Sequence, residues 1–253
     1  MPREFHSYRV EAVVLRHMNW GEADRLLTLF TRQQGKITVV AKGVRKIRSR
    51  KAGHLEPFTR VSLQLAKSHT HPFVTQAETI DAHIPLRENL ILLSQASYVV
   101  ELLDKFTYEE GEHLSLYNLL DQTLSRLSDP ASEPLVVLRY YEMRLLDYVG
   151  FRPVMFACVV CGEPVRPEDQ FFSAEKGGVV GPECAQRLAG LRPISMDALR
   201  YLRHFQRSSY PEAARADPSP ETHREMEGLM QHYLTYVLER GLNSPIFLRK
   251  VNR

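Results

Sequence analysis

The segment YRVEAVVLRH, residues 8–17, decides the fold of the N-terminal part of this chain. It is rich in β-branched residues, which predicts a β-strand. Four shorter runs of the same kind follow, at residues 26–31, 36–41, 61–66 and 73–79. Turn-forming residues separate these runs, as expected between the strands of a small sheet. The pattern therefore predicts five short strands within residues 8–80.

Five short strands are typical of a small closed or partly open barrel. The OB-fold is the commonest five-stranded arrangement that removes most sheet edges, and an SH3-like barrel fits the same pattern. The sequence pattern alone does not separate the two.

The hydrophobic pattern changes at Pro85, where leucines begin to recur at helical spacing. We expect a first helix from about Leu86, then helices over residues 112–127, 133–149, 196–207 and 219–240, with a surface loop over 207–220. Residues 154–190 form an irregular module that contains the three cysteines. The predicted fold class is α+β: an N-terminal five-stranded OB-fold β-barrel at residues 1–80, followed by an all-α helical domain at residues 81–253 with an inserted zinc-ribbon-like module at residues 154–190.

Composition indicates a soluble globular protein, with 43% apolar and 25% charged residues among 253. An odd count of three cysteines, two of them in one short motif, argues against a disulfide framework. The N-terminus carries charges where a signal peptide would need an apolar segment. No stretch approaches the ~20 apolar residues of a membrane span. We expect a cytoplasmic protein without a membrane anchor.

The clearest electrostatic feature is a basic stretch in the predicted barrel. Residues 25–55 contain no acidic residue, and six of their nine lysines and arginines fall within residues 42–51. A basic loop beside a barrel face is suited to phosphate binding, because each cation that meets a phosphate releases condensed counterions. A solvated loop is the alternative. The candidate DNA-binding residues are Arg25, Arg32, Lys36, Lys42, Arg45, Lys46, Arg48, Arg50 and Lys51.

Aromatic residues in the same region have two interpretations. OB-folds stack unpaired bases on aromatic faces, at about 1–3 kcal/mol per base. Phe30, Phe58 and Phe73 are candidates for this role, and they are equally suited to the barrel core.

The second feature is Cys158-Val-Val-Cys161, followed after 22 residues by Cys184. A zinc ribbon holds its metal with two Cys-x-x-Cys pairs, but here the second pair reads Gly181-Pro-Glu-Cys184. Three thiolates with a carboxylate, a histidine or water could still hold one structural zinc ion. Glu183, Asp169 and His204 are possible fourth ligands. The alternative is a metal-free remnant of a ribbon.

Enzymatic interpretations find little support. The sequence lacks a Gly-x-x-x-x-Gly-Lys-[Ser/Thr] loop and a Gly-x-Ser-x-Gly elbow, so we expect no nucleotide cofactor and no catalytic residues. Two other hypotheses stay open at this point, an RNA-binding OB-fold protein and a zinc-dependent nucleic-acid-modifying enzyme.

The order of these parts resembles the RecO family of bacterial DNA repair and recombination proteins. The segments that carry the resemblance are YRVEAVVL (8–15), GEADRL (21–26), GKITVVAKG (35–43), GFRP (150–153), CVVCG (158–162), and FS (172–173) leading to GG (177–178). The resemblance covers nearly the whole chain. No single motif is highly specific, but their order and spacing are.

The resemblance implies a recombination mediator without enzymatic activity. Such a protein binds single- and double-stranded DNA, anneals complementary strands without ATP, and works with RecR, and in some cases RecF, to load RecA. It also implies contact with the acidic tail of single-strand-binding protein, an OB-fold N-terminal domain, and a cytoplasmic, nucleoid-associated location. The family's zinc ligands map onto Cys158, Cys161, Gly181 and Cys184, and Gly181 departs from the pattern.

Overall fold

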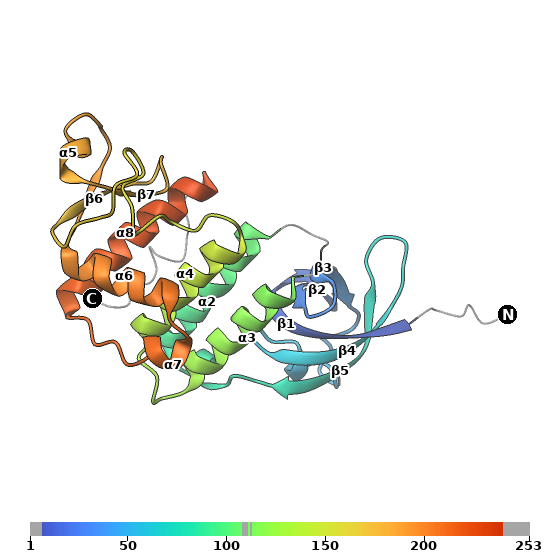
Figure 1. The fold of residues 1–253 in the computed structure, drawn as a ribbon. Coiled ribbons are helices and arrows are strands. Elements are labelled where there is room, and N and C mark those ends of the chain that lie inside the picture. Colours follow the sequence, from blue (N-terminus) through green and yellow to red (C-terminus); the bar gives the residue numbers. More distant parts are fainter. Residues whose placement is uncertain (1–6, 108–110, 112, 240–253) are drawn as a thin grey trace. The chain divides into compact units, whose positions relative to one another are not determined.

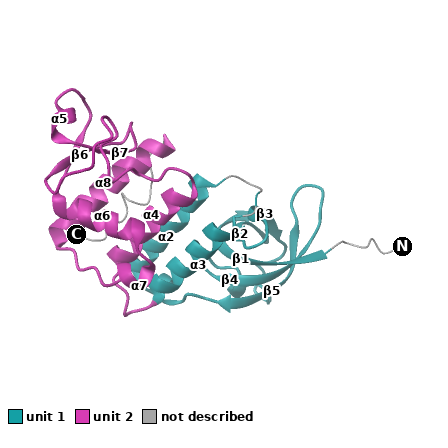
Figure 2. Cartoon of the chain, viewed as in Figure 1, with its two compact units in different colours: residues 1–128, 251–253 teal, residues 129–250 magenta. Residues whose placement is uncertain are grey.

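The computed structural model describes residues 7–107, 111 and 113–239. It divides into two compact units, one built from residues 1–128 and one from residues 129–250 (Figure 2). The predicted boundary near residue 80 falls inside unit 1, between its barrel and its helices. In the described part of the chain, no helix has both the length and the apolar character needed to cross a lipid bilayer.

The N-terminal strands form a closed five-stranded barrel, which confirms the predicted fold class (Figure 1). Its strands run in the order β1-β2-β3-β5-β4, with β3 and β5 parallel. All five strands coincide with predicted runs, and several extend further at their ends. They are β1 (Ser7–Trp20), β2 (Asp24–Thr31), β3 (Gly35–Ala41), β4 (Arg60–Ala66) and β5 (Phe73–Asp81).

Strand β1 is the longest strand of the barrel, and its two halves pair with different neighbours. Its first half pairs with β4, from Ser7 opposite Ala66 onward, and its second half pairs with β2 as far as Trp20 opposite Asp24. The register shifts between Val14 and Arg16, which marks a bulge where the strand passes from one partner to the other. Alternate residues of β1 face inward and are buried in the barrel core, among them Val10, Ala12 and Val14.

Three helices follow the barrel in unit 1: α1 (Pro85–Glu88), α2 (Leu90–Phe106) and α3 (Leu114–Ser128). The helix that we expected from about Leu86 is divided at Asn89. The Asn89 side chain accepts hydrogen bonds from the backbone N–H groups of Ile91 and Leu92, so this residue caps α2 and ends α1.

A charged cluster joins the barrel to α3. Glu11 on β1 accepts hydrogen bonds from Arg60 Nε at 2.8 Å and from the Tyr117 hydroxyl at 2.9 Å. Arg60 also contacts Asp121 at 3.1 Å. Burial by itself would raise the pKa of Glu11, but the hydrogen bonds from Arg60 and Tyr117 outweigh it and the pKa is lowered. Glu11 is therefore held as a carboxylate between two strands and a helix.

Unit 2 combines helices with a small three-stranded sheet of order β7-β6-β8. The sheet arises from the cysteine module that we expected to be irregular, together with the segment that follows it. The elements are α4 (Pro134–Tyr148), β6 (Gln170–Ser173), β7 (Gly178–Val180), α5 (Pro182–Ala185), β8 (Arg192–Ile194), α6 (Met196–Arg207), α7 (Tyr210–Ala213) and α8 (Pro220–Leu238).

The short helix α7 lies inside the segment that we expected to be a surface loop. Ser209 precedes it, and Glu212 lies three residues later. The two residues form a capping box, in which the Glu212 carboxylate accepts hydrogen bonds from the Ser209 backbone and hydroxyl, each at 2.8 Å. The Pro-rich composition hid this helix start.

Lys36 on β3 connects the barrel to the C-terminal end of α2. Its ammonium donates to the backbone carbonyl of Asp104 at 2.7 Å, to the Asp104 carboxylate at 3.0 Å and to the backbone carbonyl of Thr107. The side chain is only 12% exposed. A cation at this position satisfies carbonyls that the helix end leaves without partners.

Replacing Lys36 by methionine should lower the free energy of unfolding by about 1–3 kcal/mol, because buried acceptors lose their donor. Urea unfolding followed by circular dichroism measures this change. The matched control is Lys46→Met, at an exposed position, which should change stability by less than about 0.5 kcal/mol. Equal effects of the two substitutions would contradict the capping role of Lys36.

Candidate nucleic-acid interface and cysteine cluster

The nine candidate cations are not equally available to a ligand. Lys36 is engaged with α2 as described. Arg25 donates to Glu56 at 2.9 Å and its side chain is 21% exposed. Lys51 is half-buried, its ammonium donates to the Val74 carbonyl at 2.9 Å, and burial lowers its pKa. These three cations stabilise the barrel and its adjoining segments.

The other six cations are exposed. Arg32 lies in the turn after β2, where its guanidinium is 3.8 Å from Glu11. The remaining five share the connection that follows β3, and we call this group the basic loop: Lys42, Arg45, Lys46, Arg48 and Arg50. Exposed cations concentrated in one short segment are suited to following a phosphate backbone.

The basic loop is folded into successive turns. Asp24 accepts a hydrogen bond from the Gly43 backbone at 2.7 Å, and the Ala23 carbonyl accepts one from the Arg45 backbone at 2.9 Å. Val44 is buried in the barrel core. Gly43 has a φ of +64°, which favours glycine. The segment GEADRL thus anchors the loop and presents its cations outward.

The structure separates the three candidate aromatics. Phe30 and Phe58 are 0% and 3% exposed, so they belong to the interior. Phe73 at the start of β5 is only partly buried, and the Lys42 ammonium lies 4.5 Å from the centre of its ring. Of the three, Phe73 alone is placed where it could meet a base.

Trp20 is an exposed aromatic that the sequence analysis missed. It is 51% exposed at the end of β1 and is the only tryptophan in the chain. The carbonyl of the next residue, Gly21, accepts a hydrogen bond from the Arg45 guanidinium at 3.2 Å, which places Trp20 beside the basic loop. Ile47 at the tip of this loop is fully exposed. The signal in the sequence was a lone tryptophan directly before GEADRL.

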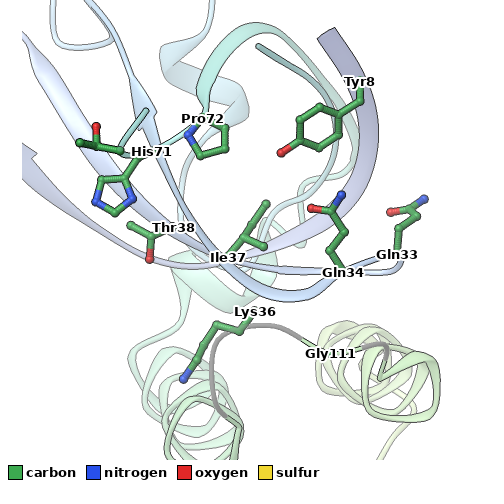
Figure 3. A pocket seen from close by; sticks show the side chains of 10 residues that line it. Tyr8, Gln33, Gln34, Lys36, Ile37, Thr38, His71, Pro72 and Gly111 are labelled. Carbon is green, nitrogen blue, oxygen red and sulfur yellow. The ribbon is translucent and has the colours of Figure 1, made fainter. Parts of the chain in front are cut away.

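A hollow of about 560 Å³ lies along β3 and the connection between β4 and β5 (Figure 3). Tyr8, Gln34, Ile37, His71 and Pro72 are among the side chains that line it, whereas Lys36 extends from β3 toward the helices (Figure 3). Pro72 of this hollow directly precedes Phe73, over whose ring the Lys42 ammonium lies. In OB-folds this strand and loop face binds oligonucleotides.

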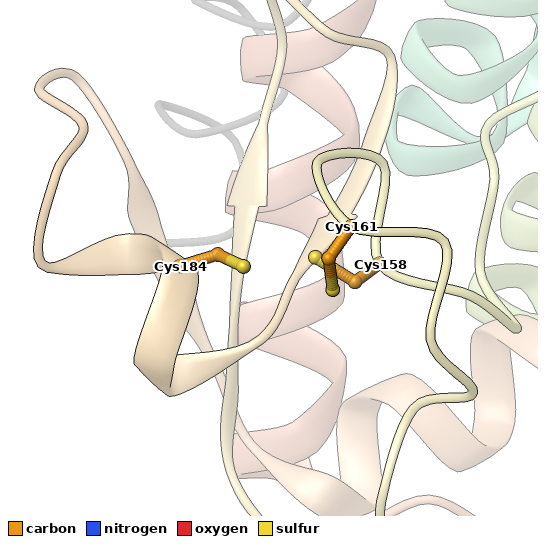
Figure 4. A group of neighbouring side chains, drawn as sticks. All are labelled: Cys158, Cys161 and Cys184. Carbon is orange, nitrogen blue, oxygen red and sulfur yellow. The ribbon is translucent and has the colours of Figure 1, made fainter.

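The three cysteines of unit 2 meet in space. Cys158 and Cys161 lie on one loop, Cys184 lies on α5, and their sulfur atoms point toward one another (Figure 4). All three sulfurs are within 4.8 Å of one another, as thiolates around one metal ion would be.

Two of the thiols have opposite pKa shifts. Burial by itself would raise the pKa of Cys158, but hydrogen bonds from the backbone amides of Gly181, Cys161 and Val160 lower it to about 7. The hydrogen bond with Cys161 raises the pKa of Cys184 to about 11. Backbone donors thus favour one thiolate, as they do at structural metal sites.

Of the three suggested fourth ligands, Glu183 alone lines the cavity that the three cysteines share. Glu183 is exposed and pairs with Arg166 at 3.5 Å. Asp169 accepts a hydrogen bond from the Met196 backbone, and the His204 ring contacts the Ser208 hydroxyl. Three thiolates are therefore ready to hold a metal, and Gly181 contributes only a backbone N–H, which donates to Cys158 Sγ at 3.4 Å.

Comparison with known proteins agrees with this architecture. Residues 5–83 match the family model described as "Recombination protein O N terminal", and residues 87–246 match "Recombination protein O C terminal". Among curated relatives named "DNA repair protein RecO", that of Roseiflexus sp. is 39% identical over 248 residues, which is 97% of this chain and 86% of that protein. That of Bifidobacterium adolescentis is 35% identical, over 94% of this chain and 97% of that protein. The chain belongs to the RecO family of DNA repair and recombination proteins.

Proposed function

We propose that this protein is a recombination mediator that binds single- and double-stranded DNA and anneals complementary strands without ATP. The observation that carries the proposal is a basic and aromatic track: the exposed cations of the basic loop, Trp20 beside them, and the Phe73 ring with its centre 4.5 Å from the Lys42 ammonium. Cations along this track would neutralise phosphates, while the aromatics would stack on unpaired bases.

Annealing of two DNA strands requires neutralisation of their phosphate charges more than it requires a catalytic group. Two phosphate backbones repel each other, and a basic surface that contacts both lowers this repulsion. Base pairing then supplies the driving force. In this proposal the protein acts as a binding protein and not as an enzyme, and it works beside the nucleoid in the cytoplasm.

We further propose that the protein acts with RecR, and with RecF where that protein takes part, to help RecA replace single-strand-binding protein. A pocket in unit 2 supports contact with the acidic tail of single-strand-binding protein, which ends in phenylalanine. The pocket has a volume of about 560 Å³, and Phe156, Met196 and Leu199 supply apolar surface.

Arginines on α6 surround this pocket. Arg200 and Arg207 are exposed, and the Arg207 guanidinium lies 3.4 Å from the centre of the Phe156 ring. Arg203 donates to the Met155 carbonyl at 2.8 Å and so stabilises the wall of the pocket. Arg200 also pairs with Asp197 at 3.3 Å, which leaves Arg207 as the exposed guanidinium beside the apolar pocket. Such an arrangement suits a peptide that ends in an aromatic side chain and a carboxylate.

Replacing Lys42, Arg45, Lys46 and Arg48 together by alanine should weaken binding of single-stranded DNA. It should also flatten the salt dependence of log K by about 0.7 per lost phosphate contact. Fluorescence anisotropy of a labelled oligonucleotide at several salt concentrations gives both quantities. The control removes four exposed cations from unit 2: Arg187, Arg192, Arg215 and Arg224. A salt slope that stays the same in the basic-loop variant would overturn the assignment.

Saturating single-stranded DNA should quench the fluorescence of the single tryptophan, because Trp20 would stack on a base. Replacing Trp20 by alanine should weaken binding by about 1–3 kcal/mol, whereas Trp20→Phe should retain most of the affinity. Unchanged fluorescence at DNA concentrations that saturate the anisotropy signal would remove Trp20 from the interface.

An acidic peptide that ends in phenylalanine should bind this pocket, and Arg207→Ala should weaken the binding by about 1.5–3 kcal/mol, the value of a hydrogen bond to a charged group. Arg224→Ala, outside the pocket, is the control. A peptide with an amidated C-terminus should also bind less tightly. Equal binding of the free and amidated peptides by wild-type protein would contradict recognition of the carboxylate.

A further inference from the structure

The cysteine cluster lacks a fourth thiolate, and the space for one is present. Gly181 has φ −65° and ψ 153°, a conformation that any residue adopts. Chain neighbours aside, a Cβ added to Gly181 would come within 4 Å of one atom of the described residues, the Gln170 side-chain oxygen, at 3.9 Å. The gap left by the missing cysteine side chain therefore faces Gln170.

Gln170 begins β6 and is 2% exposed. Its Nε2 donates to the carbonyls of Arg166 and Glu168, at 3.4 and 3.2 Å, which fixes the orientation of the amide. The other amide atom, Oε1, is fully buried and has no hydrogen-bond partner within the described part of the chain. Native structures rarely leave such an acceptor unsatisfied, so this oxygen points to a missing ligand.

Gln170 and the three cysteines line the same cavity, which has a volume of about 240 Å³. Gly181 lines it as well. A side-chain carbonyl oxygen carries a lone pair that can bind a divalent cation, although it binds zinc less tightly than a thiolate does. Glu163, Glu168 and Glu183 line the cavity as well, but the compact ligand cluster in it consists of the three thiols, whose sulfur atoms lie within 4.8 Å of one another. With the orphan oxygen of Gln170 they make up the four ligands that a tetrahedral zinc site needs.

We infer that Gln170 Oε1 is the fourth zinc ligand of this protein, in place of the cysteine that Gly181 cannot supply. The site is then Cys158, Cys161, Cys184 and Gln170. Because the amide is neutral, the occupied site has a formal charge of −1, where a four-thiolate site would have −2. Of the groups considered earlier, Asp169 accepts a hydrogen bond from the Met196 backbone, and Glu183 is an exposed side chain that lies 3.5 Å from Arg166.

The test measures zinc affinity of the reduced full-length chain by competition with a chromogenic chelator. Wild type should bind one zinc ion per chain. Gln170→Ala should lower the affinity at least about tenfold, the lower end of what groups around a metal contribute. Gln170→Glu should raise it, because a carboxylate is a stronger zinc ligand than an amide.

Gln170→Glu distinguishes a zinc ligand at this position from a residue with a purely structural role. A carboxylate cannot donate to the Arg166 and Glu168 carbonyls, so a structural role for Gln170 predicts that Gln170→Glu also weakens the site. Lower affinity in both variants, or wild-type affinity in Gln170→Ala, would overturn the inference. A wild-type chain that binds less than one zinc ion would overturn it as well.

A second set of variants, made in a protein that carries Gly181→Cys, makes the test independent of folding defects caused by Gln170→Ala. Gly181→Cys restores a fourth thiolate and should raise zinc affinity, and in this background Gln170→Ala should have little effect. If Gln170→Ala costs the same in both backgrounds, its oxygen is not a ligand. Cobalt substitution gives a spectroscopic check, because the sulfur-to-cobalt absorption near the ultraviolet should increase from three thiolates in wild type to four in Gly181→Cys.

Discussion

The barrel of unit 1 depends on its longest strand, β1, whose two halves pair with different neighbours. The first half of β1 pairs with β4 and the second half with β2, and the bulge between Val14 and Arg16 lets the strand turn from one to the other. The sheet closes on itself through the remaining pairings and is left with few free edges. The position of the β1–β2 turn, and with it Trp20 and the anchor of the basic loop, follows from this closure.

The lysines and arginines of the barrel and of the basic loop have two separate roles. Lys36 and Arg25 are partly buried and hold the barrel to α2 and to Glu56, while the cations of the basic loop face outward. A count of positive residues treats these groups alike. Their difference comes from acceptors far away in the sequence, such as the Asp104 and Thr107 carbonyls for Lys36. The exposed basic surface is therefore smaller than the number of lysines and arginines suggests, and it is concentrated in the basic loop.

The sequence predicted the five strands because β-branched runs and turn residues alternate clearly between residues 8 and 80. Leucine spacing likewise predicted α2, α3 and α4, and α6 and α8 also coincide with predicted helices. It missed α7, whose start is encoded by a four-residue capping box, and the division at Asn89, which depends on side-chain hydrogen bonds. At the candidate sites, local pattern found the cations and the cysteines. Trp20 and Gln170 were missed because their importance comes from neighbours that are distant in sequence.

The last seam of the barrel, the pairing of β3 with β5, has the fewest paired residues. β3 and β5 meet in a parallel bridge at Val40 and Phe73, with a hydrogen bond from the Val40 backbone to the Pro72 carbonyl at 2.9 Å. The other seams extend along most of their strands. Local opening of the native state begins where the fewest hydrogen bonds must break. A ligand that contacts both Lys42 and Phe73 would bind only while β3 and β5 are paired. Its binding free energy would therefore add to the free energy of local opening, and the barrel amides would exchange more slowly.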